Sequence, residues 1–188
     1  FASAFAPELS RLERDGHLRE VSTFGARLGE VARGAAAAVH EIDHSHPHRT
    51  LIHGDLKSAN IFLRPKAGEE GADFEAALID FQWSGFGLAA TDLAYLIASS
   101  ASDELLTLDG QGEAALLDFY LSKLNEALQE NGLSEGLLSR ETLQAQYEIA
   151  LVDICRLAAA YQWPRIKASP EVLRGNAASL GRCATINP

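Results

Sequence analysis

The stretch that decides the fold is LIHGDLKSANIFL, which spans residues 51–63. Its apolar ends are typical of two short strands, and its polar middle predicts a loop between them. Asp55 and Asn60 are separated by only part of this loop, so both side chains can face one cavity. Functional residues are common in loops at strand ends, because the strands supply a rigid scaffold. We therefore expect the chemistry of this chain to centre on the loop.

A polar segment and a further apolar run follow the loop. Residues 64–74 combine proline, glycine and charged residues, which indicates a surface turn. The run AALI, residues 76–79, predicts a strand that returns beside residues 60–63 and completes a small hairpin. This strand ends at Asp80, so the hairpin brings a second carboxylate back to the edge where Asp55 lies.

Three oxygen-bearing side chains form the candidate site: Asp55, Asn60 and Asp80. Phosphoryl transfer from a nucleotide needs a carboxylate near the acceptor hydroxyl and oxygen ligands that hold Mg²⁺ on the phosphates. Aspartate and asparagine are hard oxygen donors, which suit Mg²⁺ better than softer metals. The plain alternative for Asp55 is a turn residue beside Gly54. For Asn60 and Asp80 the alternative is a strand-end hydrogen bond.

Two separate motifs resemble a known superfamily. HGDLKSAN, residues 53–60, has the pattern H-G-D-x-x-x-x-N, and IDFQ follows at residues 79–82. Together they resemble the aminoglycoside phosphotransferase and choline kinase superfamily, whose members are relatives of protein kinases. With TDLAYL at residues 91–96, the sequence looks most like the CHK kinase-like, or ecdysteroid-kinase-like, branch. The resemblance is close from about residue 50 to residue 99.

This resemblance implies transfer of the ATP γ-phosphoryl group to a hydroxyl of a small organic molecule, with Mg²⁺. Asp55 matches the catalytic base that orients the acceptor hydroxyl. Asn60 and Asp80 match the metal ligands that hold the nucleotide phosphates. The acceptor is left open, because choline-like, aminoglycoside-like and steroid-like compounds all occur among relatives.

Three further residues take supporting roles by the same resemblance. His53 matches a residue of the catalytic loop that supports it by hydrogen bonding. Lys57 stands where many protein kinases have a lysine near the transferred phosphate, and its charge can offset negative charge there. A solvated surface lysine is the alternative. Asp92 resembles an acid that gives the loop structural support from below, or it is a helix N-terminal acid favoured by the helix dipole.

Other residues near the motifs have competing explanations. The four histidines between residues 40 and 48 suggest a metal site, but the sequence shows no matching acid or cysteine, so a solvated loop is expected. Trp83 and Phe86 follow the second motif. They either line an acceptor pocket or pack within the lobe.

The rest of the chain is predicted to be mostly helical, because apolar residues recur at spacings of three and four. We expect helices at residues 8–43, 91–99, 112–130, 139–162 and about 170–183. Thr91 is the expected N-cap of the second helix. The fold class is therefore α+β, mostly α: a protein-kinase-like C-terminal lobe with a small catalytic β-hairpin and surrounding helices.

Residues 1–188 are expected to form this one lobe. Residues 1–49 would be a helical segment after the interlobe hinge, residues 50–99 the catalytic and metal-binding core, and residues 100–188 a helical subdomain. A complete kinase of this type also has an N-terminal lobe, with a glycine-rich loop over the phosphates and a lysine held by a glutamate. Neither pattern occurs before residue 50, so we expect the N-terminal lobe to be absent from this chain.

Two function classes follow. In the first, an N-terminal lobe or a partner chain supplies the nucleotide clamp, and this chain alone is slow or inactive. In the second, the chain is a catalytically inactive, kinase-derived binding or scaffold subunit of a larger assembly. A protein kinase is a weaker hypothesis, since Gln82 replaces the glycine of the D-F-G motif.

Composition narrows the partners and the location. The 188 residues carry a formal net charge of −10, so the average surface repels nucleic acid. No run approaches the ~18 apolar residues of a transmembrane segment. The two cysteines lack metal-type spacing and are too few for a disulfide framework. An intracellular, cytoplasmic location is the simplest expectation, with an organelle as the alternative.

Overall fold

A computed structural model of the protein describes residues 14, 23–65, 74–102, 104–107 and 109–158. The helix expected at residues 170–183 lies outside these ranges. So do most of the start of the first expected helix, most of the expected turn at residues 64–74, and the end of the helix expected at residues 139–162.

Two small antiparallel sheets carry the polar loop. β1 (Arg49–Ile52) pairs with β4 (Gly85–Leu88). β2 (Ile61–Pro65) pairs with β3 (Phe74–Leu78). The second pair is the hairpin that the sequence predicts, so that prediction is confirmed.

β4 is a strand that the sequence did not reveal. Its residues GFGL have glycine at alternate positions, which weakens the strand signal. Gly87 pairs with Thr50, and a Cβ at Gly87 would lie 2.7 Å from Ile52 Cδ1. Glycine at this position therefore leaves room for the Ile52 side chain over β4.

Four helices make up most of the described structure. They are α2 (Phe24–His40), α3 (Ala89–Ser100), α4 (Gln111–Glu130) and α5 (Arg140–Leu157). Each overlaps a helix that the sequence predicts. With the two small sheets, they make the described part of the chain α+β and mostly helical, as predicted.

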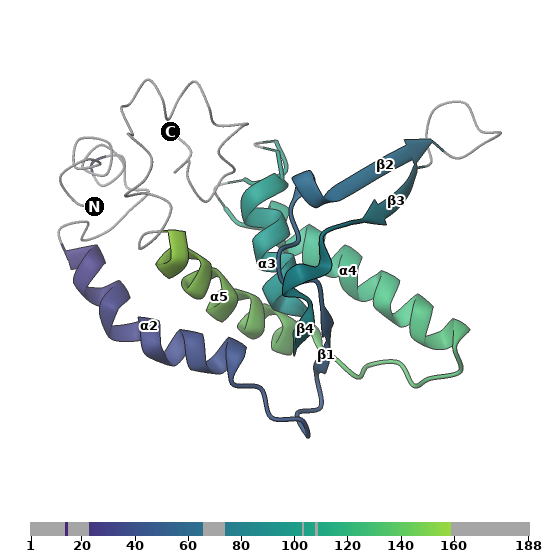
Figure 1. Ribbon diagram of the computed structural model, residues 1–188, viewed down its shortest axis with the longest axis horizontal. Coiled ribbons are helices and arrows are strands. Elements are labelled where there is room, and N and C mark those ends of the chain that lie inside the picture. Colours follow the sequence, from purple (N-terminus) through teal and green to yellow (C-terminus); the bar gives the residue numbers. More distant parts are fainter. Residues whose placement is uncertain (1–13, 15–22, 66–73, 103, 108, 159–188) are drawn as a thin grey trace.

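The core lies where the apolar faces of these helices meet. α5 packs against both α2 and α3, and Figure 1 shows it running between them. Ala90 and Ala94 are fully buried, and their small side chains allow α3 to approach its neighbours closely. The buried cluster comprises Val39, Ala90, Ala94, Ile97, Leu117, Leu121, Leu143, Tyr147, Ala150 and Ile154.

The start of α3 differs from the prediction. The helix begins at Ala89 with Leu88 as its N-cap. Thr91 lies in the first turn, where its hydroxyl donates to the Leu88 carbonyl, so its assignment as N-cap is wrong. Alanine is the best helix former, and Ala90 is buried in the core, so the helix extends toward its N-terminus past Thr91.

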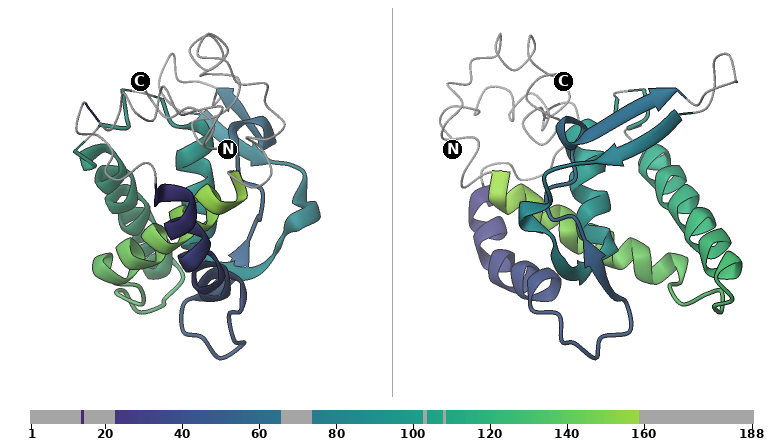
Figure 2. Two further views of the ribbon diagram at one scale, coloured as in Figure 1. Left: turned by 90° about the vertical axis from the view of Figure 1, so that its left-hand side faces the viewer. Right: turned by 45° about the vertical axis from the view of Figure 1, so that its right-hand side comes forward.

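The β2–β3 hairpin extends away from the helices in Figure 1 and in the right-hand view of Figure 2. Every residue of β3 is exposed. Large exposed apolar side chains of the hairpin are Phe62, Leu63, Phe74 and Leu78. No helix within the described ranges is both long enough and apolar enough to cross a lipid bilayer.

Candidate functional site

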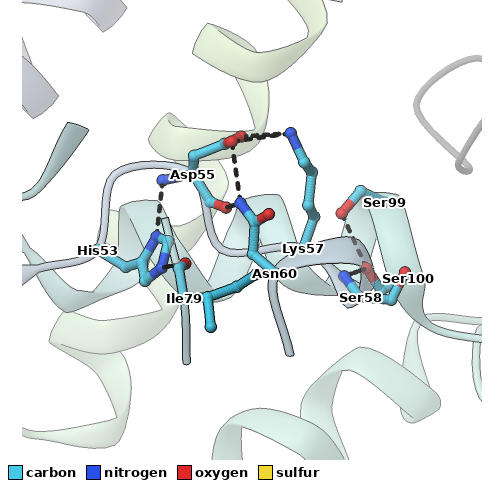
Figure 3. A network of polar contacts seen from close by, with 8 residues as sticks. All are labelled: His53, Asp55, Lys57, Ser58, Asn60, Ile79, Ser99 and Ser100. Carbon is cyan, nitrogen blue, oxygen red and sulfur yellow. Dashed lines mark hydrogen bonds and ion pairs between the residues drawn. The ribbon is translucent and has the colours of Figure 1, made fainter. Parts of the chain in front are cut away.

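The loop between β1 and β2 holds the Asp55 carboxylate through two partners (Figure 3). Lys57 Nζ lies 3.0 Å from Asp55 Oδ1 and 2.8 Å from Asp55 Oδ2. The Asn60 side-chain amide donates to Asp55 Oδ2 over 3.1 Å and to the Asp55 backbone carbonyl over 2.9 Å. The Asp55 side chain keeps a relative exposure of 15%. The carboxylate is therefore oriented but still partly open to solvent.

A short 3₁₀ turn, η2 (Ser58–Asn60), brings both partners to Asp55. Lys57 is its N-cap, and the Asn60 N–H donates to the Lys57 carbonyl over 2.8 Å. Because the turn folds the chain back, the side chains of Lys57 and Asn60 both reach Asp55 (Figure 3). The sequence places these residues within one motif, and the structure brings them into contact.

Lys57 is held as a cation by its surroundings. Its hydrogen bonds to Asp55 raise the pKa of the ammonium above the usual value, while burial opposes this rise. The negative charge of Asp80 raises the same pKa. Asp80 therefore lies close enough to act electrostatically on the Asp55–Lys57 pair.

His53 connects the start of the loop to the end of β3. It is buried, its Nε2 lies 2.8 Å from the Ile79 carbonyl oxygen, and its Nδ1 lies 3.3 Å from the Asp55 backbone nitrogen. A carbonyl oxygen only accepts and a backbone N–H only donates, so the two bonds together require a neutral ring with its proton on Nε2. The Phe81 ring lies 4.9 Å from the imidazole, centroid to centroid.

Asp92 holds the loop from the first turn of α3. Its carboxylate accepts the backbone N–H of His53 over 2.6 Å and that of Gly54 over 2.9 Å. Gly54 has φ 81°, and a Cβ there would lie 2.1 Å from the Trp83 carbonyl oxygen. Both groups that Asp92 binds are main-chain groups of the loop, so Asp92 sets the backbone path that leads into Asp55.

Asp80 stands in an unusual backbone conformation. With φ 64° and ψ 59°, it is the one non-glycine residue with positive φ in the described part of the chain. It precedes the short turn η3 (Phe81–Trp83), but its side chain does not cap that turn. Aspartate tolerates this region better than most residues, yet the conformation still costs free energy and is common at functional sites.

The oxygen donors here fit Mg²⁺. The side-chain amide nitrogen of Asn60 donates hydrogen bonds to Asp55, so the amide oxygen is the atom that could bind the metal ion. Asp80 supplies an exposed carboxylate. Among the residues that the structure describes, no group of three or more His, Cys, Asp or Glu side chains is arranged to hold a metal ion. A Mg²⁺ site on Asn60 and Asp80 therefore needs phosphate oxygens and water as its other ligands, as is usual for this ion.

The histidines between residues 40 and 48 do not form a metal centre by the same criterion. His40 Nε2 lies 2.8 Å from Asp153 Oδ2, and His48 Nδ1 lies 3.1 Å from Gln146 Nε2. The sequence pattern indicated no acid partner for these histidines, but Asp153 is a partner of His40, and His44 Nδ1 lies 3.3 Å from Asp43 Oδ1. Since Asp153 belongs to α5, nothing near His40 in the sequence could have indicated it.

Trp83 and Phe86 are both largely exposed. Trp83 follows the Asp80 motif, and its main chain packs on Gly54, next to Asp55. Phe86 lies on β4, and the Arg49 guanidinium carbon sits 3.9 Å from the centre of its ring. Of these two aromatic residues, Trp83 is the one whose backbone adjoins the loop.

Ser100 is a contact of the loop that sequence reasoning missed. Its hydroxyl accepts the backbone N–H of Ser58 over 2.8 Å. A serine at the end of a helix belongs to no motif, so no sequence signal indicated this contact.

The described part of the chain is α+β and mostly helical, and it gathers a carboxylate, an amide and a lysine on one loop, which is compatible with the class of kinase-like proteins. The comparison with family models agrees with this class, because the model of the ecdysteroid kinase-like family matches residues 8–133. The chain belongs to the ecdysteroid kinase-like family. The resemblance inferred from the motifs is thereby confirmed. Comparisons with curated proteins and with solved structures gave no match.

Proposed function

We propose that this protein transfers the γ-phosphoryl group of ATP to a hydroxyl of a small organic molecule, with Mg²⁺. The observation that carries the proposal is the Asp55 carboxylate, held by Lys57 and Asn60 at hydrogen-bond distance and still partly exposed. Membership of the ecdysteroid kinase-like family supports the same reaction class.

In this proposal Asp55 acts on the acceptor. Its carboxylate orients the hydroxyl and takes its proton as the new O–P bond forms. The bond between the γ-phosphorus and the bridging oxygen breaks, and ADP leaves with the electron pair. Because Lys57 and Asn60 fix the carboxylate before the acceptor arrives, little reorganisation is needed during the reaction. Lys57 also places a positive charge beside the transferred group.

Asn60 and Asp80 would hold Mg²⁺ through their side-chain oxygens. When bound, the ion neutralises charge on the nucleotide phosphates. His53 and Asp92 act on the loop itself: the first links it to Ile79, and the second fixes the backbone of residues 53 and 54. The left-handed backbone of Asp80 lies between two backbone hydrogen bonds, from the Ile79 N–H to the Asn60 carbonyl and from the Ser84 N–H to the Phe81 carbonyl.

We further propose that the acceptor lies against Trp83. The residue is 67% exposed, and its main chain adjoins Gly54, one residue before Asp55. An aromatic face beside a catalytic loop offers a large contact area for a small molecule. We propose that the clamp over the nucleotide phosphates comes from an N-terminal lobe or a partner chain. We also propose that the reaction takes place inside the cell.

A second candidate is an inactive binding subunit derived from a kinase. It is favoured by the exposed apolar side chains of the hairpin, among them Phe62, Leu63 and Phe74. Such side chains on a projecting element often mark a contact surface.

The two candidates are separated by product formation. The protein, together with the N-terminal lobe or partner chain that supplies the nucleotide clamp (below, the full-length protein), is incubated with ATP, Mg²⁺ and a panel of small alcohols, and the products are followed by ³¹P NMR. A new phosphomonoester signal that needs both Mg²⁺ and an alcohol supports the kinase. ATP that persists with every alcohol, although it binds to the protein, would reject the kinase and leave the binding subunit.

A further inference from the structure

Helix α3 contacts the catalytic loop at both of its ends. In the first turn of α3, Asp92 accepts the N–H groups of His53 and Gly54. At the last residue of α3, the Ser100 hydroxyl accepts the N–H of Ser58 over 2.8 Å (Figure 3). Ser100 lies eight positions after Asp92, which corresponds to about 12 Å along the helix at 1.5 Å per residue. Because a helix is stiff over this length, α3 fixes the distance between the two ends of the loop.

Ser58 is a sensitive point of the loop, because it begins η2. Lys57 is the N-cap of that turn and Asn60 is its last residue, and both side chains bind Asp55. The first N–H groups of a helical turn have no partner within the turn. Ser100 supplies one for Ser58 and thereby anchors the segment that carries both partners of Asp55.

The Ser100 hydroxyl also lies within hydrogen-bond distance of a neighbouring hydroxyl. Ser99 Oγ lies 3.1 Å from Ser100 Oγ, so one hydroxyl can donate to the other (Figure 3). A serine hydroxyl has one donor and two acceptor lone pairs, so Ser100 can accept from Ser58 and still bond to Ser99.

We propose that Ser100 is a positioning residue, which keeps Lys57 and Asn60 against the Asp55 carboxylate by anchoring η2 to the C-terminal end of α3. Its effect on turnover rests on the phosphotransferase function proposed above. Its effect on the loop does not, because the anchor is a property of the folded chain.

The test compares Ser100→Ala with two matched variants. Ser99→Ala removes the neighbouring hydroxyl and keeps the bond to Ser58, and Ser100→Thr keeps a hydroxyl at the anchoring position. The first readout is hydrogen exchange of the Ser58 amide by NMR. We expect exchange about five-fold faster in Ser100→Ala, the equivalent of one hydrogen bond. Ser99→Ala and Ser100→Thr should stay near wild type. Unchanged Ser58 exchange in Ser100→Ala would overturn the proposal.

The second readout is steady-state phosphotransfer by the full-length protein. Ser100→Ala should lower kcat about five-fold with little change in KM for ATP. Ser100→Thr should restore kcat, and the melting temperature of Ser100→Ala should match that of Ser99→Ala. A kcat that Ser100→Thr does not restore, or that follows melting temperature across the variants, would overturn the positioning role. If wild-type protein shows no transfer, the proposed function fails, and Ser58 exchange alone decides the anchor.

Discussion

Lys57 shows how the charge on one residue is tied to the state of the loop. Its hydrogen bonds to Asp55 raise the pKa of its ammonium in the folded protein. A raised pKa means that the ion pair stabilises the fold fully below the unfolded value of about 10.4. This contribution is lost as the pH rises through the higher, folded pKa.

Replacing Lys57 should therefore have an effect that changes with pH in the alkaline range. We expect the difference in unfolding free energy between wild type and Lys57→Met to be constant from about pH 7 to 9 and to shrink above about pH 10.4. Urea unfolding at each pH measures it. A difference that stays constant throughout the alkaline range would contradict the raised pKa.

Asp80 carries a prediction about the metal. Because its exposed carboxylate is one of two proposed protein ligands, Asp80→Ala should raise the Mg²⁺ concentration needed for half-maximal ATP binding about ten-fold or more in the full-length protein. Titration calorimetry at several Mg²⁺ concentrations gives the value. Asp118→Ala, which removes an exposed acid of α4, is the control. If the two variants needed the same Mg²⁺ concentration, the proposal that Asp80 is a Mg²⁺ ligand would be wrong.

At the scale of single residues, the sequence predicted contacts within a motif but did not reveal contacts between distant segments. Asp55, Lys57 and Asn60 lie within six residues of one another, so spacing alone could suggest that they meet. Ser58 and Ser100 are 42 residues apart, and His40 and Asp153 are 113 apart. Such pairs depend on how the helices pack, which no local pattern of residues encodes.

At the scale of elements, the turn between β1 and η2 depends on Gly54. Its φ is 81°, and an added Cβ would lie 2.1 Å from the backbone oxygen of Trp83. A main-chain group cannot move aside as a flexible side chain can. The loop and η3 can therefore pack this closely only if residue 54 has no side chain.

We expect Gly54→Ala to destabilise the protein by about 1–3 kcal/mol, since both the positive φ and the contact with Trp83 become unfavourable. Urea denaturation measures the loss. Gly85→Ala is the matched control, because a Cβ at Gly85 meets no atom within 4 Å. Equal stability of the two variants would show that the loop does not need glycine at position 54.

Elements with a strong periodic pattern were predicted well, and those without one were not. The four helices overlap their expected ranges, since apolar spacing and burial agree along them. β4 escaped prediction because its residues include two glycines, and it is defined by pairing with β1. Threonine is common at N-caps, which favours Thr91 as the cap, whereas α3 begins at Ala89 and buries Ala90 in the core.

At the scale of the whole molecule, a buried carboxylate links α2 to α5. Asp153 is 2% exposed and lies 2.8 Å from both His40 Nε2 and Arg156 Nε. A buried acid needs such partners, because an unpaired one is costly. α5 also packs against α3. This link therefore fixes α2 to the same helix framework that supports the loop.

Asp153→Ala should lower the unfolding free energy by about 1–3 kcal/mol, because it leaves two partly exposed partners unpaired. Glu148→Ala, an exposed acid on the same helix, should change it by less than about 0.5 kcal/mol. Denaturation curves of both variants provide the measurement. If Asp153→Ala were as stable as Glu148→Ala, the link between α2 and α5 would contribute nothing to the unfolding free energy.

The α+β fold class could be predicted from the order of helices and strands along the sequence. The family could be predicted from the two motifs at residues 53–60 and 79–82. The motifs fall in the part of the chain that surrounds the loop, and the family match extends over residues 8–133. What the sequence could not supply is the contact between Ser58 and Ser100 at the C-terminal end of α3, because that contact depends on where the far end of the helix lies in space.

The central claim is that Asp55 serves as the base for phosphoryl transfer. Its most direct test is a single-turnover experiment with full-length Asp55→Asn, in which bound ATP, Mg²⁺ and an active acceptor are mixed and the phosphomonoester is followed with time. We predict a rate about 10²–10⁴-fold below wild type, with ATP affinity unchanged and Asp118→Asn at the wild-type rate. A rate near wild type for Asp55→Asn would contradict the account.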